Sequence, residues 1–203
     1  MPRIWPTMTL DFQLVRTGLW QWSKGIGLER FELLQGKDEW ILRGTIITLS
    51  DRGPEQAAPA EARYEVVCDG AWRTRKASIA VREAGEERTL QIMAEDGIWY
   101  ENGVLNQAVS GSVDIDLGWS PSTNTLPIRR LHLKVGEASG EITAAWVQFP
   151  DLKLQPLAQE YLRISDRQYR YSSRGGAFVA QISVDDQGLV VDYEGFWRRV
   201  KQA

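Results

Sequence analysis

The chain has 203 residues, of which 43% are hydrophobic and 25% charged, a balance typical of a folded globular protein. Its formal net charge is −3, so no basic field favours nucleic acid as a partner. No stretch approaches the roughly 18 consecutive apolar residues that a membrane-spanning helix needs, so no transmembrane segment is expected.

The N-terminal segment contains Pro2 and Pro6 and has weak periodicity. We therefore expect residues 1–18 to form an extension and residues 19–203 to form a single domain. The segment lacks the apolar core of a secretory signal, and Cys68 is the only cysteine, so no intrachain disulfide can form. Both features favour a cytoplasmic protein.

Between residues 28 and 101, apolar and polar residues alternate in short stretches that end at turn signals. A period of two residues predicts strands that place one face on a core. A loop is expected at residues 50–61, which carry Gly and Pro, and a hairpin turn at Asp69 and Gly70. The strands expected here are residues 28–34, 39–49, 63–68, 72–82, 88–94 and 98–101.

The alternation breaks in residues 113–131, which combine acids, amides, hydroxyls and arginines. Residues 113–117 predict a strand, and residues 124–131 predict a short helix with Pro127 in its first turn. Asn124 or a neighbouring hydroxyl is expected to cap this helix by accepting from its first N–H groups. Apolar residues on several sides of the helix predict that it is buried, and a strand is expected to resume at residues 131–135.

After residue 141 the chain returns to strand patterns. Strands are expected at residues 141–149, 168–173, 178–184 and 189–193, with an edge-type extended segment at 152–156. Residues 159–165 are compatible with a helical turn. About a dozen or more hairpin-linked strands and one helix predict a mainly β fold, built on a large antiparallel sheet, barrel or roll.

The acids and arginines of residues 113–131 allow more than one interpretation. Asp114 and Asp116 share one face of the expected strand, where two carboxylates could act as general acid and base in a hydrolase. We favour the alternative that they bind the following loop or pair with arginines. Arg129 and Arg130 either cap carbonyls, pair with these acids, or bind an anion or a sugar headgroup. His132 is the only histidine, so a structural or exposed role is favoured over a catalytic one.

A binding site is the other interpretation of the polar residues. Arg73 and Arg75 share one face of an expected strand and, with an arginine of the helix, would make a positive rim. Tyrosines would supply the walls of a non-catalytic pocket of ~300–1,000 Å³ near the helix. In the alternative, each arginine pairs with an acid across the sheet. No catalytic residue, metal or cofactor is predicted, because no nucleophile elbow, zinc motif or phosphate-cradling loop is found. The candidate ligand-binding residues are Arg73, Arg75, Asp114, Asp116, Asn124, Arg129, Arg130, Tyr161, Tyr169 and Tyr171.

Eight segments between residues 19 and 197 resemble, in order and spacing, a bacterial family named for glycolipid binding, formerly a domain of unknown function. The run from Thr123 to Arg130 is the most specific of them. The first 18 residues lie outside the resemblance. The matching segments are WRTR (72–75), VDID (113–116), TNTLPIRRL (123–131), WVQFP (146–150), QEY (159–161), YRY (169–171), DDQGLV (185–190) and DY (192–193).

The resemblance implies a spiral β-roll, in which a long, many-stranded and mostly antiparallel sheet wraps around a single short helix. It also implies a homodimer and the binding of a glycolipid or a similar amphiphilic small molecule. We therefore expect a non-catalytic binding protein. The alternatives are a structural or interaction protein that acts as a homodimer, and a hydrolase that uses Asp114 and Asp116.

Overall fold

The computed structural model describes residues 12–50 and 57–200. The first part of the chain forms strands that are joined by turns, and each strand pairs with the strand before it. Alternation gives these strands one face on the core, as in Pro59–Asp69, where every second residue is buried. The strands are β1 (Gln13–Trp22), β2 (Gly27–Gln35), β3 (Glu39–Leu49), β4 (Pro59–Asp69), β5 (Thr74–Glu83), β6 (Glu86–Glu95), β7 (Ile98–Glu101) and β8 (Val104–Leu105).

Short helices interrupt the strands in the second part of the chain. The only α-helix in the described residues is α1 (Thr125–Leu131), which agrees with the helix expected at residues 124–131. The other elements are the 3₁₀ turns η1 (Gln107–Val109), η2 (Ser122–Asn124) and η3 (Arg174–Gly176), and the strands β9 (Asp114–Leu117), β10 (Ile142–Val147), β11 (Leu154–Ser165), β12 (Gln168–Ser173), β13 (Phe178–Val184), β14 (Val190–Tyr193) and β15 (Trp197–Arg199).

All fifteen strands of the described residues belong to one sheet, in the order β8-β7-β6-β5-β4-β3-β2-β1-β15-β14-β13-β12-β11-β10-β9. The two parts of the chain meet where β1 pairs with β15. Neighbouring strands are antiparallel, with the exception of β9 and β10, which run parallel. The expected mainly β fold with one long, mostly antiparallel sheet is therefore confirmed.

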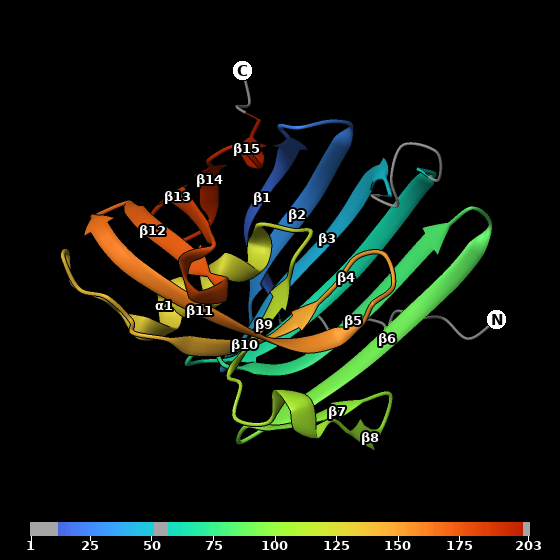
Figure 1. Ribbon diagram of the computed structural model, residues 1–203, viewed down its shortest axis with the longest axis horizontal. Coiled ribbons are helices and arrows are strands. Elements are labelled where there is room, and N and C mark those ends of the chain that lie inside the picture. The colour runs from blue at the N-terminus through green and yellow to red at the C-terminus, as the bar shows by residue number, and fades with distance from the viewer. Residues whose placement is uncertain (1–11, 51–56, 201–203) are drawn as a thin grey trace.

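The sheet curls back on itself, so that its last strand, β9, reaches the start of β5 (Figure 1). The amide of Thr74 donates to the carbonyl of Val113 at 3.2 Å, and the amide of Ile115 donates to the Thr74 hydroxyl at 2.9 Å. Helix α1 lies inside this curl, where Leu126 and Ile128 belong to the same buried cluster as residues of both parts of the sheet. The arrangement is that of a roll around one short helix.

The interior is rich in aromatic rings, and two of the buried indoles donate hydrogen bonds to backbone carbonyls. Trp20 and Trp99 are both 0% exposed, and their indole N–H groups donate to the carbonyls of Val190 and Ser112, each at 2.8 Å. Most of the tryptophan side chains in the described residues belong to the core. Trp20, Trp72, Trp99, Trp119 and Trp197 are buried, Trp22, Trp40 and Trp146 are partly exposed, and Trp5 lies outside the described residues.

Several local predictions are wrong. No strand resumes at residues 131–135, because His132 takes a left-handed conformation (φ 48°) at the end of α1 and a turn follows in which the amide of Glu137 donates to the carbonyl of Lys134. Residues 159–165 belong to the twelve-residue strand β11, not to a helical turn. Strand β1 begins at Gln13, before the expected start of the strands at residue 19. Half of the loop expected at residues 50–61 lies outside the described residues, and β4 already begins at Pro59. In the described part of the chain, no helix has the length and hydropathy needed to cross a membrane.

Candidate functional site

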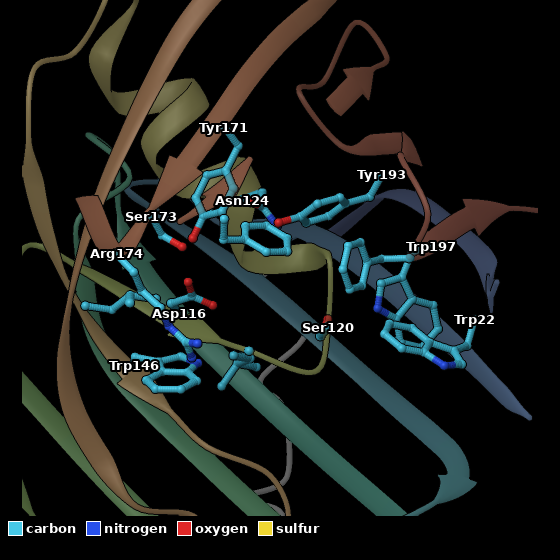
Figure 2. Close-up of a pocket in the computed structure, with 15 residues that line it drawn as sticks. Trp22, Asp116, Ser120, Asn124, Trp146, Tyr171, Ser173, Arg174, Tyr193 and Trp197 are labelled. Atoms are coloured by element: carbon cyan, nitrogen blue, oxygen red, sulfur yellow. The ribbon is translucent and has the colours of Figure 1, made fainter. Parts of the chain in front are cut away.

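A pocket of about 300 Å³ opens at the mouth of the roll, beside the first residues of the α1 segment (Figure 2). It lies where the end of β9 faces β12, the η3 turn and the β14–β15 turn. Its wall is aromatic, with a small group of polar side chains on one side. The lining residues are Trp22, Asp116, Leu117, Gly118, Ser120, Asn124, Trp146, Leu157, Tyr171, Ser173, Arg174, Phe178, Tyr193, Phe196 and Trp197.

Asp116 supplies the carboxylate of this pocket. It lies near the end of β9, and the side-chain amide of Gln159 on β11 donates to its Oδ2 atom. Burial raises the pKa of the Asp116 carboxyl to about 6, and the nearby charge of Asp114 acts in the same direction. At neutral pH the group is therefore largely an ionised hydrogen-bond acceptor, with one oxygen not engaged by Gln159.

Arg174 supplies the cation. It begins the η3 turn, where Arg174, Gly175 and Gly176 all have positive φ angles, of 54°, 63° and 85°. This conformation is unfavourable for an arginine, and contacts with the surrounding structure offset its energetic cost. It directs the guanidinium over the ring of Trp146, with 5.3 Å between Cζ and the ring centre, and toward Asp116 (Figure 2). No carboxylate of the described residues lies within ion-pair distance of this guanidinium.

The aromatic wall is a connected set of edge-to-face and tilted ring contacts. Tyr171 lies 5.9 Å from Phe178 and 6.1 Å from Tyr193, measured between ring centres. Phe196 lies 5.3 Å from Phe178 and 5.4 Å from Tyr193. Trp22 completes the wall against Phe196 and Trp197 at 5.6 and 5.2 Å. Each ring is held by its neighbours, so the wall is rigid and preformed.

A buried carboxyl group lies behind the pocket. Glu29 on β2 is 0% exposed, and its Oε1 atom accepts from the hydroxyl of Tyr64 at 2.5 Å and from that of Ser120 at 2.8 Å. Ser120 lines the pocket, so this network connects the core to the site. Burial raises the pKa of Glu29 to about 8, and the two hydrogen bonds only partly offset this effect. Glu29 is therefore mostly neutral at pH 7.

A second cavity of about 710 Å³ adjoins the first and shares Trp22, Gly118, Trp146 and Trp197 with it. Its walls come mainly from the β1–β2 turn, the end of β3 and the segment after β10. The remaining lining residues are Lys24, Gly25, Ile26, Ile46, Thr48, Leu49, Ser50, Trp119, Gln148, Phe149 and Asp151.

Of the candidate residues, Asp116, Asn124 and Tyr171 line the first pocket. Asn124 or a neighbouring hydroxyl was also expected to cap the helix, and this prediction is wrong, because neither η2 nor α1 has a side-chain cap. The chain enters α1 through η2, so Asn124 already has helical angles, and its amide donates instead to the carbonyl of Pro121 at 3.2 Å. Its carbonyl oxygen accepts from the hydroxyl of the buried Tyr161 at 3.0 Å. The hydroxyl that accepts an amide at the start of the helical segment is that of Ser120, from Ser122.

The expected pairing of an acid with an arginine is confirmed for Asp114. Arg130 forms two hydrogen bonds to its carboxylate, at 3.0 and 2.6 Å, and Asp114 is 3% exposed. Burial raises the pKa of Asp114, and the guanidinium counteracts that rise. Arg130 is therefore a structural partner of Asp114, and neither residue lines the two cavities.

The expected arginine rim is wrong for this pocket. Arg73 is exposed just before β5 and Arg75 is half-buried within it, and neither residue lines the first pocket. Arg129 lies against the ring of Trp72, at 5.2 Å from Cζ to the ring centre, and does not line the first pocket. The arginine at the rim is Arg174.

Tyr161 and Tyr169 are buried in the core and do not line the first pocket. Sequence reasoning also missed Arg174 and the tryptophans at the mouth. The available signal for Arg174 was a charged residue placed directly before Gly175 and Gly176 in a hairpin turn, since such turns often present functional side chains.

Comparison with known proteins places the chain in a family. A family model described as "Putative glycolipid-binding" matches residues 17–199. The crystal structure of a DUF1089 family protein from Pseudomonas aeruginosa is 30% identical in sequence, with a TM-score of 0.77, and the match covers 98% of this chain and 100% of that one. No curated protein matches the chain significantly. Because the family model spans nearly the whole described chain and the related structure shares its fold throughout, the chain belongs to the family described as "Putative glycolipid-binding".

Proposed function

We propose that this protein binds a glycolipid-like amphiphile without converting it, and that one sugar ring of the headgroup occupies the first pocket. The observation that carries the proposal is the placement of Asp116 and Arg174 on one side of a preformed aromatic wall. The family to which the chain belongs supports a binding role.

The chemistry of the pocket suits a neutral sugar. A carboxylate accepts hydrogen bonds from hydroxyl groups, whereas a guanidinium offers a fixed fork of donors to hydroxyl oxygens. The opposite charges of Asp116 and Arg174 balance, so the pocket does not call for a charged headgroup. Aromatic rings present apolar faces to the C–H groups of a sugar ring, and Tyr171 and Trp146 lie beside the two charged groups (Figure 2).

The two alternative functions receive less support. A hydrolase that uses Asp114 and Asp116 needs two available carboxylates, but Arg130 engages both oxygens of Asp114 and only Asp116 lines the pocket. A purely structural role predicts a solidly packed roll, whereas this roll contains cavities of about 300 and 710 Å³. A homodimer and a cytoplasmic location stay predictions.

Isothermal titration with octyl β-glucoside, below the concentration at which it forms micelles, tests the proposal. Wild type is expected to bind, and Asp116→Asn and Arg174→Gln should each weaken binding by about tenfold or more, because each removes a charge-assisted hydrogen bond. Asp192→Asn and Arg170→Gln are matched controls on the outer face of neighbouring strands and should bind as wild type. No binding by wild type, or equal binding by all five proteins, would overturn the proposal.

A further inference from the structure

We infer that the second cavity is the compartment for a single apolar chain of the ligand, so that the ligand passes from one cavity to the other beside Gly118. This inference rests on the proposed binding of a sugar headgroup in the first pocket. It assigns a separate site, with its own residues and its own chemistry, to the other half of an amphiphile.

The position of the second cavity fits this role. It shares Trp22, Trp146, Trp197 and Gly118 with the first pocket, so a ligand seated in the first pocket has its nearest enclosed volume there. At about 710 Å³ it is more than twice as large as the sugar pocket. The size order is the one expected for a small headgroup and a long chain.

The walls of the second cavity are suited to hydrocarbon. Ile46, Trp119 and Phe149 supply apolar area from three different segments. Two hydroxyl groups in the wall already have partners within the protein. Thr48 donates to the carbonyl of Ile26 at 2.9 Å, and the hydroxyl of Ser50 accepts from the amide of Ala58 at 3.1 Å. Because these polar atoms are satisfied, a chain can lie against them without the cost of leaving them unpaired.

The open end of this cavity exposes apolar side chains to water. Ile26 is 71% exposed and Leu49 is 42% exposed, and both line the cavity. Covering them with the end of an alkyl chain would remove apolar surface from water, which is favourable. The charged group of Lys24, at the same end, is held over the ring of Phe196, with 3.9 Å between Nζ and the ring centre.

Gly118 explains how the two compartments meet. A Cβ atom at this position would lie 2.1 Å from Nε1 of Trp146, so only glycine lets the Nε1 edge of the indole approach the backbone. Gly118 itself is exposed, which means that its backbone faces the open volume. On the other side of the junction, Trp22 and Trp197 are held edge to face at 5.2 Å. The absence of a side chain at residue 118 thus keeps Trp146 out of the path between the cavities.

A series of alkyl β-glucosides with chains from methyl to decyl, titrated calorimetrically into the wild-type protein below micelle-forming concentrations, tests the inference. Affinity should rise by up to ~fourfold for each methylene that enters the cavity, which corresponds to about 0.8 kcal/mol per buried methylene, and should level off when the cavity is full. Gln148→Trp, which places an indole in the second cavity, should reduce this rise and leave methyl glucoside binding within about twofold of wild type. Gln155→Trp, at an exposed position of β11 outside both cavities, is the matched control and should behave as wild type.

The outcomes separate the two proposals. Glucosides that bind with an affinity independent of chain length would overturn the chain compartment and leave the sugar site intact. Failure of every glucoside to bind would overturn the proposed function itself. A chain-length rise that persists unchanged in a folded Gln148→Trp protein would place the chain elsewhere and also overturn the inference. Thermal melting of each variant establishes that it is folded.

Discussion

Glu29 is the residue whose environment departs most from that of a surface carboxyl. It is fully buried, and its Oε2 atom has no hydrogen-bond partner among the described residues. Its pKa of about 8 in the folded protein lies above the ordinary value of 4.5, so the fold stabilises the neutral form. This contribution to stability is complete below pH 4.5 and is lost as the pH rises through about 8.

Replacement of Glu29 by glutamine tests this assignment, because glutamine keeps the acceptor for Tyr64 and Ser120 but does not ionise. The free energy of unfolding of wild type should fall relative to that of Glu29→Gln by a few kcal/mol between pH 5 and pH 9. Urea denaturation at a series of pH values measures this difference. Glu86→Gln, at an exposed position, is the control, and its unfolding free energy should follow that of wild type across the pH series. If the difference between wild type and Glu29→Gln is equally independent of pH, the assignment is contradicted.

The Asp114–Arg130 pair makes a second prediction at this scale. Arg130→Ala leaves a buried carboxylate without its partner, so it should destabilise the protein by roughly 3–5 kcal/mol. Arg198→Ala breaks an exposed pair with Asp192 and should cost about 0–1 kcal/mol. Chemical denaturation of both variants checks the contrast. A loss below about 0.5 kcal/mol for Arg130→Ala would mean that the pair contributes little.

Some of these residue roles were visible in the sequence, because a strand pattern assigns each side chain to a face. The spacing of Asp114 and Asp116 before a helix that ends in arginines predicted an ion pair correctly. Glu29 lies on the same strand face as the buried Phe31. A charged residue at a core-facing position was therefore the sequence signal for a buried carboxyl group. Its partner Ser120 lies far away in the chain, and no local pattern could have joined the two.

At the scale of elements, local signals were sufficient where one segment determines its own structure. Helix α1 and the hairpin turns follow from Pro, Gly and the period of apolar residues. The strand conformation of residues 159–165 in β11 does not follow from local signals, because these residues form a strand only by pairing with β12. The η3 turn could be located from Gly175 and Gly176, but not the pocket into which it projects.

The η3 turn allows a prediction for the element. Gly175 has φ 63° and no heavy atom near the position of a Cβ, so alanine there meets conformational strain alone. Gly175→Ala should cost roughly 1–2 kcal/mol of stability and should weaken octyl glucoside binding by displacing Arg174. Thermal melting and calorimetric titration measure the two effects. Gly70→Ala, whose Cβ would meet only ordinary contacts at 3.5 Å, should change neither. Wild-type affinity in a strained Gly175→Ala protein would show that the turn does not position the ligand.

At the scale of the whole molecule, the roll depends on the closure between β9 and the start of β5. The amide of Ile115 is buried there and has the Thr74 hydroxyl as its acceptor. Thr74→Val keeps the shape of the side chain and removes that acceptor, so it should destabilise the protein by about 1–3 kcal/mol. Thr89→Val, at an exposed position of β6, is the control. Equal unfolding free energies for the two variants would argue against the closure as a stabilising contact.

The same closure explains why the site was only partly predictable. The pocket takes its residues from β1, β9, β12, η3 and the β14–β15 turn, which meet only after the two parts of the sheet have curled toward each other. The face of a strand on which Arg73 and Arg75 lie can be derived from alternation, but which face becomes the inside of a roll cannot. The expected arginine rim therefore does not match the first pocket, whereas Asp116, Asn124 and Tyr171 do line it.

A crystal structure of the protein in complex with octyl β-glucoside tests the central claim most directly. We predict one sugar ring in the first pocket, with hydroxyl groups about 3 Å from the carboxylate of Asp116 and the guanidinium of Arg174, and the alkyl chain passing Gly118 toward Ile46. A sugar bound on the outer face beside Arg73 and Arg75, or both cavities empty at saturating ligand, would contradict the account.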